Sequence, residues 1–263
     1  MVVFAGQGDA RRSMALLWRT TRSDQVRPGP KPGLSVDLIV DTAIAVADSE
    51  GMAALSMRAV GERLGRTAMA LYTYVPSKSE LVDLMYDRAL AEVSTHHDLE
   101  AGWRAAVTSW ARETWEFYIR HPWMLQVSQA RPVLGPNEYA MIEELMRILG
   151  ETGLDAGTLR RVSGALSCFV RGAAQTVAEA RQAPVVTGLS DEEWWHARSA
   201  LLEEVAPDFA ERFPTLTWLD GEGAYRSQDE TVPYLEQEGR DTFSTGLVIL
   251  LDGIEAAMDG AGA

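Results

Sequence analysis

The sequence lacks the features that disulfide-stabilised, membrane-spanning and secreted proteins require. Its 263 residues include one cysteine, Cys168, which excludes an internal disulfide framework and a cysteine-based zinc site. The longest stretch without Asp, Glu, Lys or Arg is Thr67–Ser77, far short of the roughly 20 apolar residues of a membrane span. The first eight residues lack the charged lead and the apolar run of a signal peptide. We therefore expect a soluble, cytoplasmic protein with no membrane partner.

Motifs for catalysis are absent as well. The sequence has no nucleophile elbow, Walker loop, dinucleotide fingerprint or zinc-binding His-Glu pair. His96 and His97 are adjacent, so on a helix they point in different directions and make a poor metal pair. Cys168 lies in an apolar helical stretch and is predicted to be an inert core residue. We expect no enzyme, no cofactor and no metal site.

Negative charge is unevenly distributed along the chain. The formal net charge of −14 would oppose DNA binding, which depends on neutralising phosphates. Residues 1–90 carry 11 basic and 10 acidic side chains, whereas residues 91–263 carry 13 and 28. The acidity therefore belongs to the last two thirds of the chain, and that part is too acidic to be a second DNA site.

The first 33 residues show no sustained apolar period and end in the proline- and glycine-rich run 27–33. They carry a net charge of +4. Two interpretations stay open: a disordered tail, or a basic arm that reaches a DNA groove. Either interpretation allows a short helix around Ser13–Thr20. The sequence predicts a flexible basic arm over residues 1–33, and we expect it to become ordered only on DNA.

Helical periodicity begins at residue 34 and gives four segments with short connections up to residue 95. Each segment follows a predicted N-cap residue: Ser35, Ser56, Thr67 and Ser77. Ser77 and Glu80 have the spacing of a capping box, and this fourth helix is predicted to run to about Thr95. Only Gly65–Thr67 separates the second segment from the third, a spacing typical of a helix-turn-helix.

Four short motifs make this region more specific. They are Leu55-Ser56-Met57-Arg58, Arg63-Leu64-Gly65, Ala70-Leu71-Tyr72, and Pro76-Ser77-Lys78 followed by Leu81. With them, the stretch Leu38–Leu90 resembles the DNA-binding domain of the tetracycline-repressor (TetR) family of bacterial regulators. The resemblance implies a three-helix domain over residues 34–95 that binds a palindromic double-stranded DNA operator as part of a homodimer.

A recognition helix needs short side chains at its start so that it can approach base edges. Ala68, Met69 and Ala70 meet that need, while Arg58 and Arg66 can bond a guanine in bidentate fashion. The resemblance implies base contacts for Arg58, Ala68 and Met69, and phosphate contacts for Tyr72, Tyr74 and Lys78. Alternatively, Tyr72 packs in the core and Lys78 is a solvated side chain. The candidate DNA-binding residues are Arg58, Arg66, Thr67, Ala68, Met69, Tyr72, Thr73, Tyr74 and Lys78.

The rest of the chain is also predicted to be helical, with loops at 184–189 and 213–226 and no alternating strand pattern. The fold class expected is therefore all-α. Phe243–Glu255 resembles the C-terminal helix of the family branch nearest the tetracycline repressor. In that branch the C-terminal domain binds a small molecule and dimerises through a four-helix bundle. We expect a larger helical ligand-binding and dimerisation domain over residues 96–263.

Aromatic residues between 103 and 123 indicate an apolar interior that suits a planar ligand. The same stripe also fits an ordinary core, and His121 fits a helix-end cap as well as a ligand contact. Arg171 and Gln175 lie one turn apart on a helix that is otherwise apolar and small, so burial would leave them in need of partners. The candidate ligand-binding residues are Trp103, Trp110, Phe117, His121, Phe169, Arg171 and Gln175.

Two hypotheses on function follow. The first is a repressor released from its operator by a small hydrophobic or aromatic effector. The alternative keeps the helix-turn-helix but gives the C-terminal body a protein partner, or dimerisation alone, without an effector. Small residues at 164, 165, 172 and 173, and glycines at 246 and 253, suit a close helix seam, either between two copies or within one chain.

Overall fold

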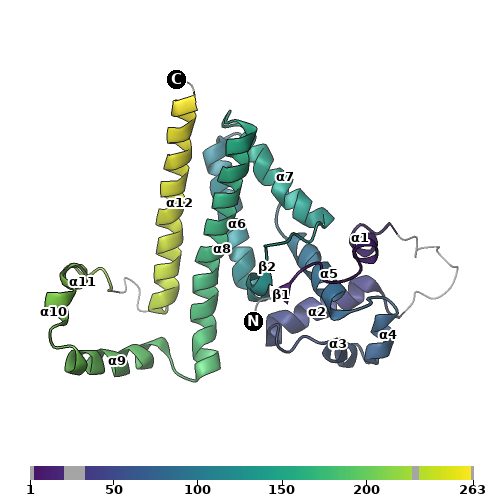
Figure 1. Ribbon diagram of the computed structural model, residues 1–263, viewed down its shortest axis with the longest axis horizontal. Coiled ribbons are helices and arrows are strands. Elements are labelled where there is room, and N and C mark those ends of the chain that lie inside the picture. Colours follow the sequence, from purple (N-terminus) through teal and green to yellow (C-terminus); the bar gives the residue numbers. More distant parts are fainter. Residues whose placement is uncertain (1–2, 21–32, 227–230, 262–263) are drawn as a thin grey trace. The chain divides into compact units, whose positions relative to one another are not determined.

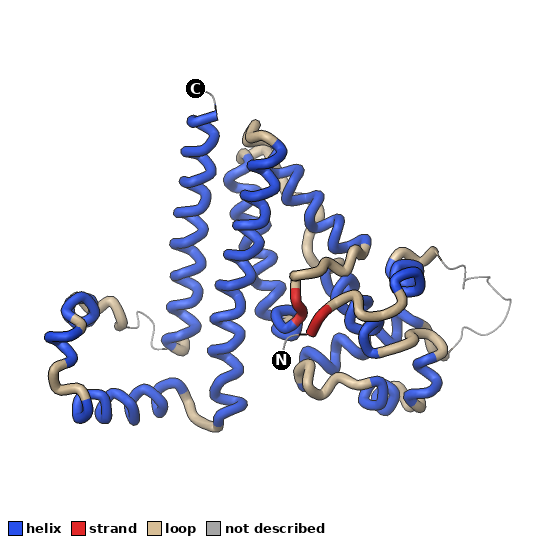
Figure 2. Tube along the Cα trace, in the orientation of Figure 1, coloured by secondary structure: helices blue, strands red, loops and turns tan. Residues whose placement is uncertain are grey.

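The computed structural model describes residues 3–20, 33–226 and 231–261, and these residues are mostly helical (Figures 1 and 2). Internal contacts divide the chain into two units, residues 1–171 with 250–263 and residues 172–249. Within the described ranges, no helix combines the length and the apolar character needed to cross a bilayer. The predicted boundary near residue 95 stays a prediction, because both sides of it belong to the first unit.

Four helices of the first unit form the helix-turn-helix region. They are α2 (Val36–Glu50), α3 (Met57–Arg63), α4 (Ala68–Tyr72) and α5 (Lys78–Leu90). Their apolar faces meet in a core of fully buried side chains: Ile39, Val60, Leu71, Leu81 and Met85. The arrangement confirms the helix-turn-helix that the sequence predicts.

Serine hydroxyls begin three of these helices. Ser35, Ser56 and Ser77 accept bonds from backbone N–H groups in the first turns of α2, α3 and α5. Thr67 takes the predicted N-cap position of α4, but its side chain makes no bond to the helix. The predicted extension of α5 to Thr95 is wrong, since the helix ends at Leu90.

The N-terminal segment differs most from expectation. It contains the strand β1 (Val3–Phe4) and the helix α1 (Ala10–Leu17). β1 pairs in parallel with β2 (Val127–Ser128). The predicted flexibility is therefore wrong for residues 3–20, whereas residues 21–32 lie outside the described residues.

Buried carboxylates of α5 explain why this segment is ordered. The N–H of Gly6 donates to both oxygens of Asp83, at 3.0 and 3.2 Å, and the N–H of Asp9 donates to Glu80 at 3.3 Å. Further along, the indole N–H of Trp18 donates to the carbonyl of Leu134 at 2.9 Å. The segment is therefore fastened both to α5 and to the loop that follows β2.

The body of the first unit surrounds α6 (Trp103–Arg120). A short 3-10 helix, η1 (Pro122–Gln126), leads from α6 into β2, and α7 (Pro136–Gly150) packs against both α5 and α6. α8 (Ala156–Thr187) begins in this unit, and Asp155 caps it as a bond acceptor for the N–H groups of Gly157 and Thr158. α12 (Tyr234–Ala261) ends in it.

In the second unit, residues 172–187 of α8 and 234–249 of α12 run antiparallel (Figure 1). Gly239 allows this approach, because a Cβ there would lie 2.4 Å from Cγ2 of Val177. Arg181 pairs with Glu236 at the same end of the two helices. α8 passes through Pro184 to Thr187, so the loop predicted at 184–189 is wrong over its first part; a proline in the last turn removes few helix bonds.

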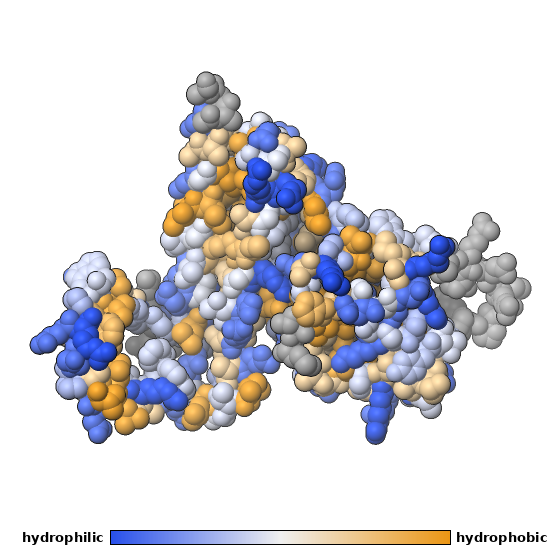
Figure 3. Space-filling view, in the orientation of Figure 1, coloured by the Kyte–Doolittle hydropathy of each residue, from blue (hydrophilic) through white to orange (hydrophobic). Residues whose placement is uncertain are grey.

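Three shorter helices complete the second unit: α9 (Asp191–Val205), α10 (Phe209–Arg212) and α11 (Pro214–Gly221). The capping box predicted for Ser190 and Glu193 is confirmed at the start of α9. The loop predicted at 213–226 is wrong over residues 214–221, because Pro214 takes the first position of α11, where its missing N–H costs nothing. Large apolar side chains are exposed on these three helices, including Trp195, Val205 and Trp218. Figure 3 shows hydrophobic surface over this part of the chain, at the lower left of the view.

Candidate DNA-binding surface and ligand cavity

Two glycines allow the tight turn between α3 and α4. Gly65 adopts a φ of +63°, a conformation that L side chains rarely take. Gly61 lies against the turn, and a Cβ on it would approach the carbonyl oxygen of Arg66 to 2.8 Å. The N–H of Arg66 donates to the carbonyl of Gly61 at 2.8 Å. This close contact fixes the angle at which α4 projects from the domain.

The candidate DNA-binding residues share one property, which is access to solvent. Only Ala68 and Tyr74 are half-buried, and the others are exposed. Met69 is 74% exposed and Tyr72 is 40% exposed, whereas Leu71 between them is fully buried. Tyr72 is therefore not a fully buried core residue like Leu71, and α4 presents Met69 and part of Tyr72 to solvent.

Positive charge on this surface is only partly neutralised. Arg58 forms an exposed ion pair with Glu62 at 2.8 Å, and this hydrogen bond raises the pKa of the guanidinium. Arg63 pairs with Glu50. Among the residues that the structure describes, neither Arg66 nor Lys78 has a carboxylate partner. Both cations are therefore available to an anionic ligand such as a phosphate.

A cavity of about 210 Å³ lies in the first unit, among α5, α6, α7 and the start of α8. α6 supplies Trp110, Thr114 and Tyr118, whose spacing of four places them on one face of the helix. The rest of the wall comes from neighbouring elements: Tyr86, Val127–Gln129, Arg131–Val133, Glu138, Met141, Ile142 and Ser167. Aromatic and apolar groups dominate this wall, as in most small-molecule sites.

Most polar groups of this wall have protein partners. The amide nitrogen of Gln129 donates to the hydroxyl oxygens of Tyr86 and Tyr118, at 3.4 Å each. Glu138 is buried and accepts the N–H of Leu134 at 2.6 Å; burial raises the pKa of its carboxyl. Two buried polar atoms of the lining residues are exceptions. Nε1 of Trp110 and Oγ1 of Thr114 have no hydrogen-bond partner among the described residues.

Of the candidate ligand-binding residues, only Trp110 lines this cavity. Phe117 is fully buried in the core, while Trp103 and Phe169 are half-buried outside the wall. Gln175 is exposed and donates to Glu179. Arg171 donates to three backbone carbonyls, those of Met124, Leu125 and Val127, so the protein itself meets its need for partners. The expectation that Cys168 is buried is wrong, because it is exposed.

The residues that sequence reasoning missed are mostly tyrosines and polar side chains. Thr114 and Tyr118 follow Trp110 at intervals of four, so the period of α6 offered a signal for both. Tyr86 and Glu138 come from other helices, and nothing local in the sequence marks them.

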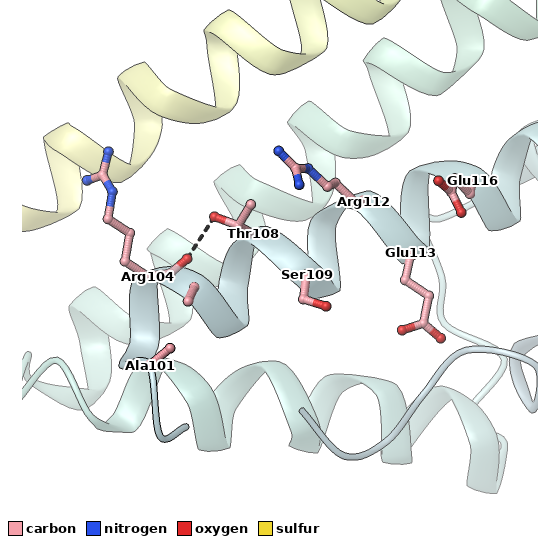
Figure 4. A pocket seen from close by; sticks show the side chains of 8 residues that line it. Ala101, Arg104, Thr108, Ser109, Arg112, Glu113 and Glu116 are labelled. Carbon is pink, nitrogen blue, oxygen red and sulfur yellow. Dashed lines mark hydrogen bonds between the residues drawn. The ribbon is translucent and has the colours of Figure 1, made fainter. Parts of the chain in front are cut away.

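A second hollow, of about 720 Å³, follows the solvent side of α6 (Figure 4). Two of its four charged side chains have partners: Arg104 pairs with Asp252 and Glu255, and Glu113 accepts the N–H of Ser94. The hydroxyl of Thr108 donates to the carbonyl of Arg104 at 2.8 Å (Figure 4). This groove is open and lined with charged side chains, so it suits an apolar ligand less well than the cavity does.

Asp48, near the end of α2, connects the helix-turn-helix region to the end of α6. One carboxylate oxygen contacts Nδ1 of His121 and accepts the indole N–H of Trp123, both at 2.8 Å. Burial opposes a charged imidazole, yet hydrogen bonds to Asp48 and Glu92 outweigh it and raise the pKa of His121. These contacts join the C-terminal end of α6 to α2.

Comparison with known families gives two matches that together span most of the chain. Residues 39–85 match the family described as bacterial regulatory proteins of the tetR family. Residues 97–258 match the tetracyclin repressor-like C-terminal domain. The two matches follow each other in the order that the fold shows.

Individual relatives agree with this assignment. The HTH-type transcriptional repressor DrrR1 of Streptomyces coeruleorubidus is 40% identical over 254 residues, which cover 95% of this chain and 87% of that protein. The TetR family protein ActR of Streptomyces coelicolor in complex with (S)-DNPA aligns with a TM-score of 0.64 and 27% identity, over 86% of this chain and 98% of that chain. ActR in complex with actinorhodin aligns with a TM-score of 0.66 and 25% identity, over 87% and 98% of the two chains.

Proposed function

Because the chain belongs to the TetR family of bacterial transcriptional regulators, we propose that it is a homodimeric repressor released from a palindromic operator by a small aromatic effector. Its family is one of regulators and not of enzymes. One observation carries the effector part of the proposal: an apolar, aromatic-lined cavity shares α5 with the helix-turn-helix.

DNA recognition is assigned to the outward face of α3, α4 and the start of α5. Arg58 and Arg66 supply bidentate donors for guanine, and Met69 supplies an apolar contact for a thymine methyl group. Lys78, Tyr72 and Tyr74 supply phosphate contacts, with Thr67 and Thr73 adding hydroxyls. One such domain reads only a few base pairs, so useful specificity requires two copies on a two-fold symmetric site.

The dimer is assigned to exposed faces of α8 and α12. Among the residues that the structure describes, nothing lies within 4 Å of a Cβ placed on Gly164, Gly172 or Gly253, so their open sides can accept a helix of a second copy. Val248 and Ile249 on α12 are 51% and 64% exposed. Side chains of this kind are normally buried, which favours a partner surface over solvent.

Coupling between effector and DNA follows from α5 and α6. α5 carries Lys78 at its first position and Tyr86 in the cavity wall. α6 carries Trp110 in that wall and leads into the contacts of His121 and Trp123 with Asp48. An effector lowers operator affinity only by binding more tightly to a conformation whose half-site spacing is wrong. Both helices therefore transmit that preference from the cavity to the DNA-binding surface.

The alternative, a body that binds a protein partner without an effector, draws support from the exposed apolar side chains of α9 to α11. Trp195 is 50% exposed and Trp218 is 61% exposed. Patches of this kind mark interaction sites. They do not explain the cavity, and for that reason the effector-released repressor is the better-supported function.

Operator binding in the presence of ligand tests the proposal. Operator DNA is first selected from random duplexes with the purified protein, and its affinity is measured by fluorescence anisotropy. Actinorhodin and a panel of aromatic natural products are then added at increasing concentration. We expect at least one compound to release the DNA while binding with a saturable shift in melting temperature. A compound that binds strongly and leaves operator affinity unchanged at saturation would contradict the coupling.

A further inference from the structure

The N-terminal segment lies outside both family matches, the first of which begins at residue 39. It is nevertheless paired and buried within the first unit. β1 forms a parallel pair with β2, and the two strands lie side by side (Figure 2). Ala5, directly after β1, is 2% exposed. Residues 3–9 are therefore part of the fold of this chain and are not a free tail.

The end of this segment contacts the first turns of α5. The N–H of Gly6 donates to both carboxylate oxygens of Asp83, and the N–H of Asp9 donates to Oε1 of Glu80 at 3.3 Å. Both carboxylates are buried, and a charged acceptor that is shielded from water forms a stronger hydrogen bond than a neutral one. Gly8 lies directly against Glu80, because a Cβ on Gly8 would overlap the carboxylate.

Glu80 also takes part in the cap of α5. The hydroxyl of Ser77 donates to Oε2 of Glu80, and its oxygen accepts the backbone N–H groups of Ser79 and Glu80 at 3.1 and 3.4 Å. Lys78 lies between Ser77 and Ser79 in this capped turn, and its side chain is exposed. A single buried carboxylate therefore joins the N-terminal segment to the turn that carries Lys78.

The other end of the segment contacts the wall of the cavity. Val127 and Ser128, which form β2, both line the cavity. Paired strands keep a fixed spacing through their backbone hydrogen bonds, so a displacement of β2 also displaces β1. The bonds to α5 begin at Gly6, only two residues after β1. The path from the cavity wall to the first turn of α5 is therefore short and continuous.

We propose that residues 3–9, which we call the strap, position Lys78 for its phosphate contact and couple that contact to the cavity wall. This inference rests on the proposed function, because it takes Lys78 to contact DNA and the cavity to be the effector site. Gly8 and Glu80 are positioning residues that act through Lys78. Coupling between two sites is reciprocal. An effector that displaces β2 therefore weakens the contact of Lys78, and operator binding stabilises the pairing of β1 with β2.

A double-mutant cycle tests the step from the strap to the DNA. Gly8→Ala forces the carboxylate of Glu80 out of its contacts, and Glu80→Asp keeps the charge but shortens the reach to Asp9 and Ser77. Operator affinities of the full-length variants are measured by fluorescence anisotropy, with and without Lys78→Ala. We expect each change to weaken operator binding by about three- to fivefold, as for other coupled neighbours, and to have almost no effect once Lys78 is replaced.

Gly150→Ala provides a matched control. Gly150 is exposed, and among the described residues nothing lies within 4 Å of a Cβ placed on it. The same substitution at this position should leave operator affinity unchanged.

Hydrogen exchange tests the step from the strap to the cavity wall. Backbone amide exchange is followed by mass spectrometry with and without a saturating amount of operator duplex. In the wild type we expect the operator to slow exchange in α4, in β1 and in β2. Gly8→Ala should lose the protection of β2 and keep that of α4. A strap that only stabilises the fold predicts no change in β2 when operator binds.

The outcomes separate the strap from the proposed function. Equal effects of Gly8→Ala and Glu80→Asp with and without Lys78, or no effect on operator affinity, overturn the positioning role. Unchanged exchange of β2 in the wild type on operator binding overturns the coupling to the cavity wall. If an aromatic compound still releases the operator in either case, the effector-released repressor stands and only the strap falls. Failure of the wild type to bind any selected duplex overturns both.

Discussion

At the scale of single residues, two buried carboxylates respond to pH in opposite directions. Burial raises the pKa of Asp83 to about 6, and the bonds from Gly6 offset only part of that cost. For Glu144, burial is outweighed by hydrogen bonds from Arg147 and His97, which hold its pKa at about 2. Asp83 therefore makes the fold less stable as pH rises from about 4 to 6. Glu144 makes it less stable as pH falls from about 4.5 to 2.

Asp83→Asn should change the pH dependence of stability. A pKa of about 6 against the ordinary value of 3.8 corresponds to about 2–3 kcal/mol of stability lost between pH 4 and pH 7. The amide does not titrate. As the pH rises over this range, the unfolding free energy of the variant should therefore increase relative to that of the wild type by up to that amount. Urea denaturation at pH 4, 5, 6 and 7 measures it.

The control for this experiment is Asp220→Asn, which removes the same charge from an exposed position. It should leave the shape of the pH profile unchanged. A constant difference between Asp83→Asn and wild type from pH 4 to pH 7 would contradict the assignment.

Arg58 and Lys78 are expected to differ in how they use their charge on DNA. Lys78→Ala should weaken binding about equally for all sequences and reduce the salt slope by about one unit, because it removes a phosphate contact. Arg58→Ala should cost about tenfold in affinity at the cognate operator and relax the preference at one base pair. Anisotropy titrations on the operator and its single-base variants, at several salt concentrations, measure both. Identical profiles for the two variants would contradict this division.

At the scale of elements, the N-terminal segment belongs to the folded body of the first unit. Leu17 is buried at the end of α1, and Ala5 is buried directly after β1. Leu17→Ala should lower the free energy of unfolding by about 2–4 kcal/mol, as for other buried leucines. Arg12→Ala on the exposed face of the same helix should change it little. Equal stability of the two variants, measured by urea denaturation, would show that α1 does not pack as described.

Local features of these elements were predictable from the sequence, whereas long-range ones were not. The serine caps of α2, α3 and α5 depend on residues two or three positions apart, and the sequence contains that information. The bond from Gly6 to Asp83 joins residues 77 positions apart, and the two-residue strands are too short to show alternation. Trp110 was predictable as a cavity residue because aromatic residues cluster around it. Tyr86 and Glu138 join it only through tertiary packing.

At the scale of the whole molecule, dimerisation is expected to control DNA binding. Ile249→Glu places a charge on an exposed apolar face of α12, where burial against a second copy would cost several kcal/mol. The variant should have the mass of a monomer by light scattering at micromolar concentration and should lose operator binding at that concentration. Leu38→Glu, at an exposed apolar position on α2, should remain a dimer. A dimeric Ile249→Glu protein would place the interface elsewhere.

The parallel pairing of β1 with β2 has a practical consequence for how the protein is produced. A purification tag joined to the first residue of this sequence would begin two residues before a strand whose partner, Val127–Ser128, lines the cavity. Bulk or charge added at that point therefore acts on the cavity wall itself. Ligand affinities measured with an uncleaved N-terminal tag should differ from those of the tag-free protein, and screening is best done with the tag removed or moved to the other end of the chain.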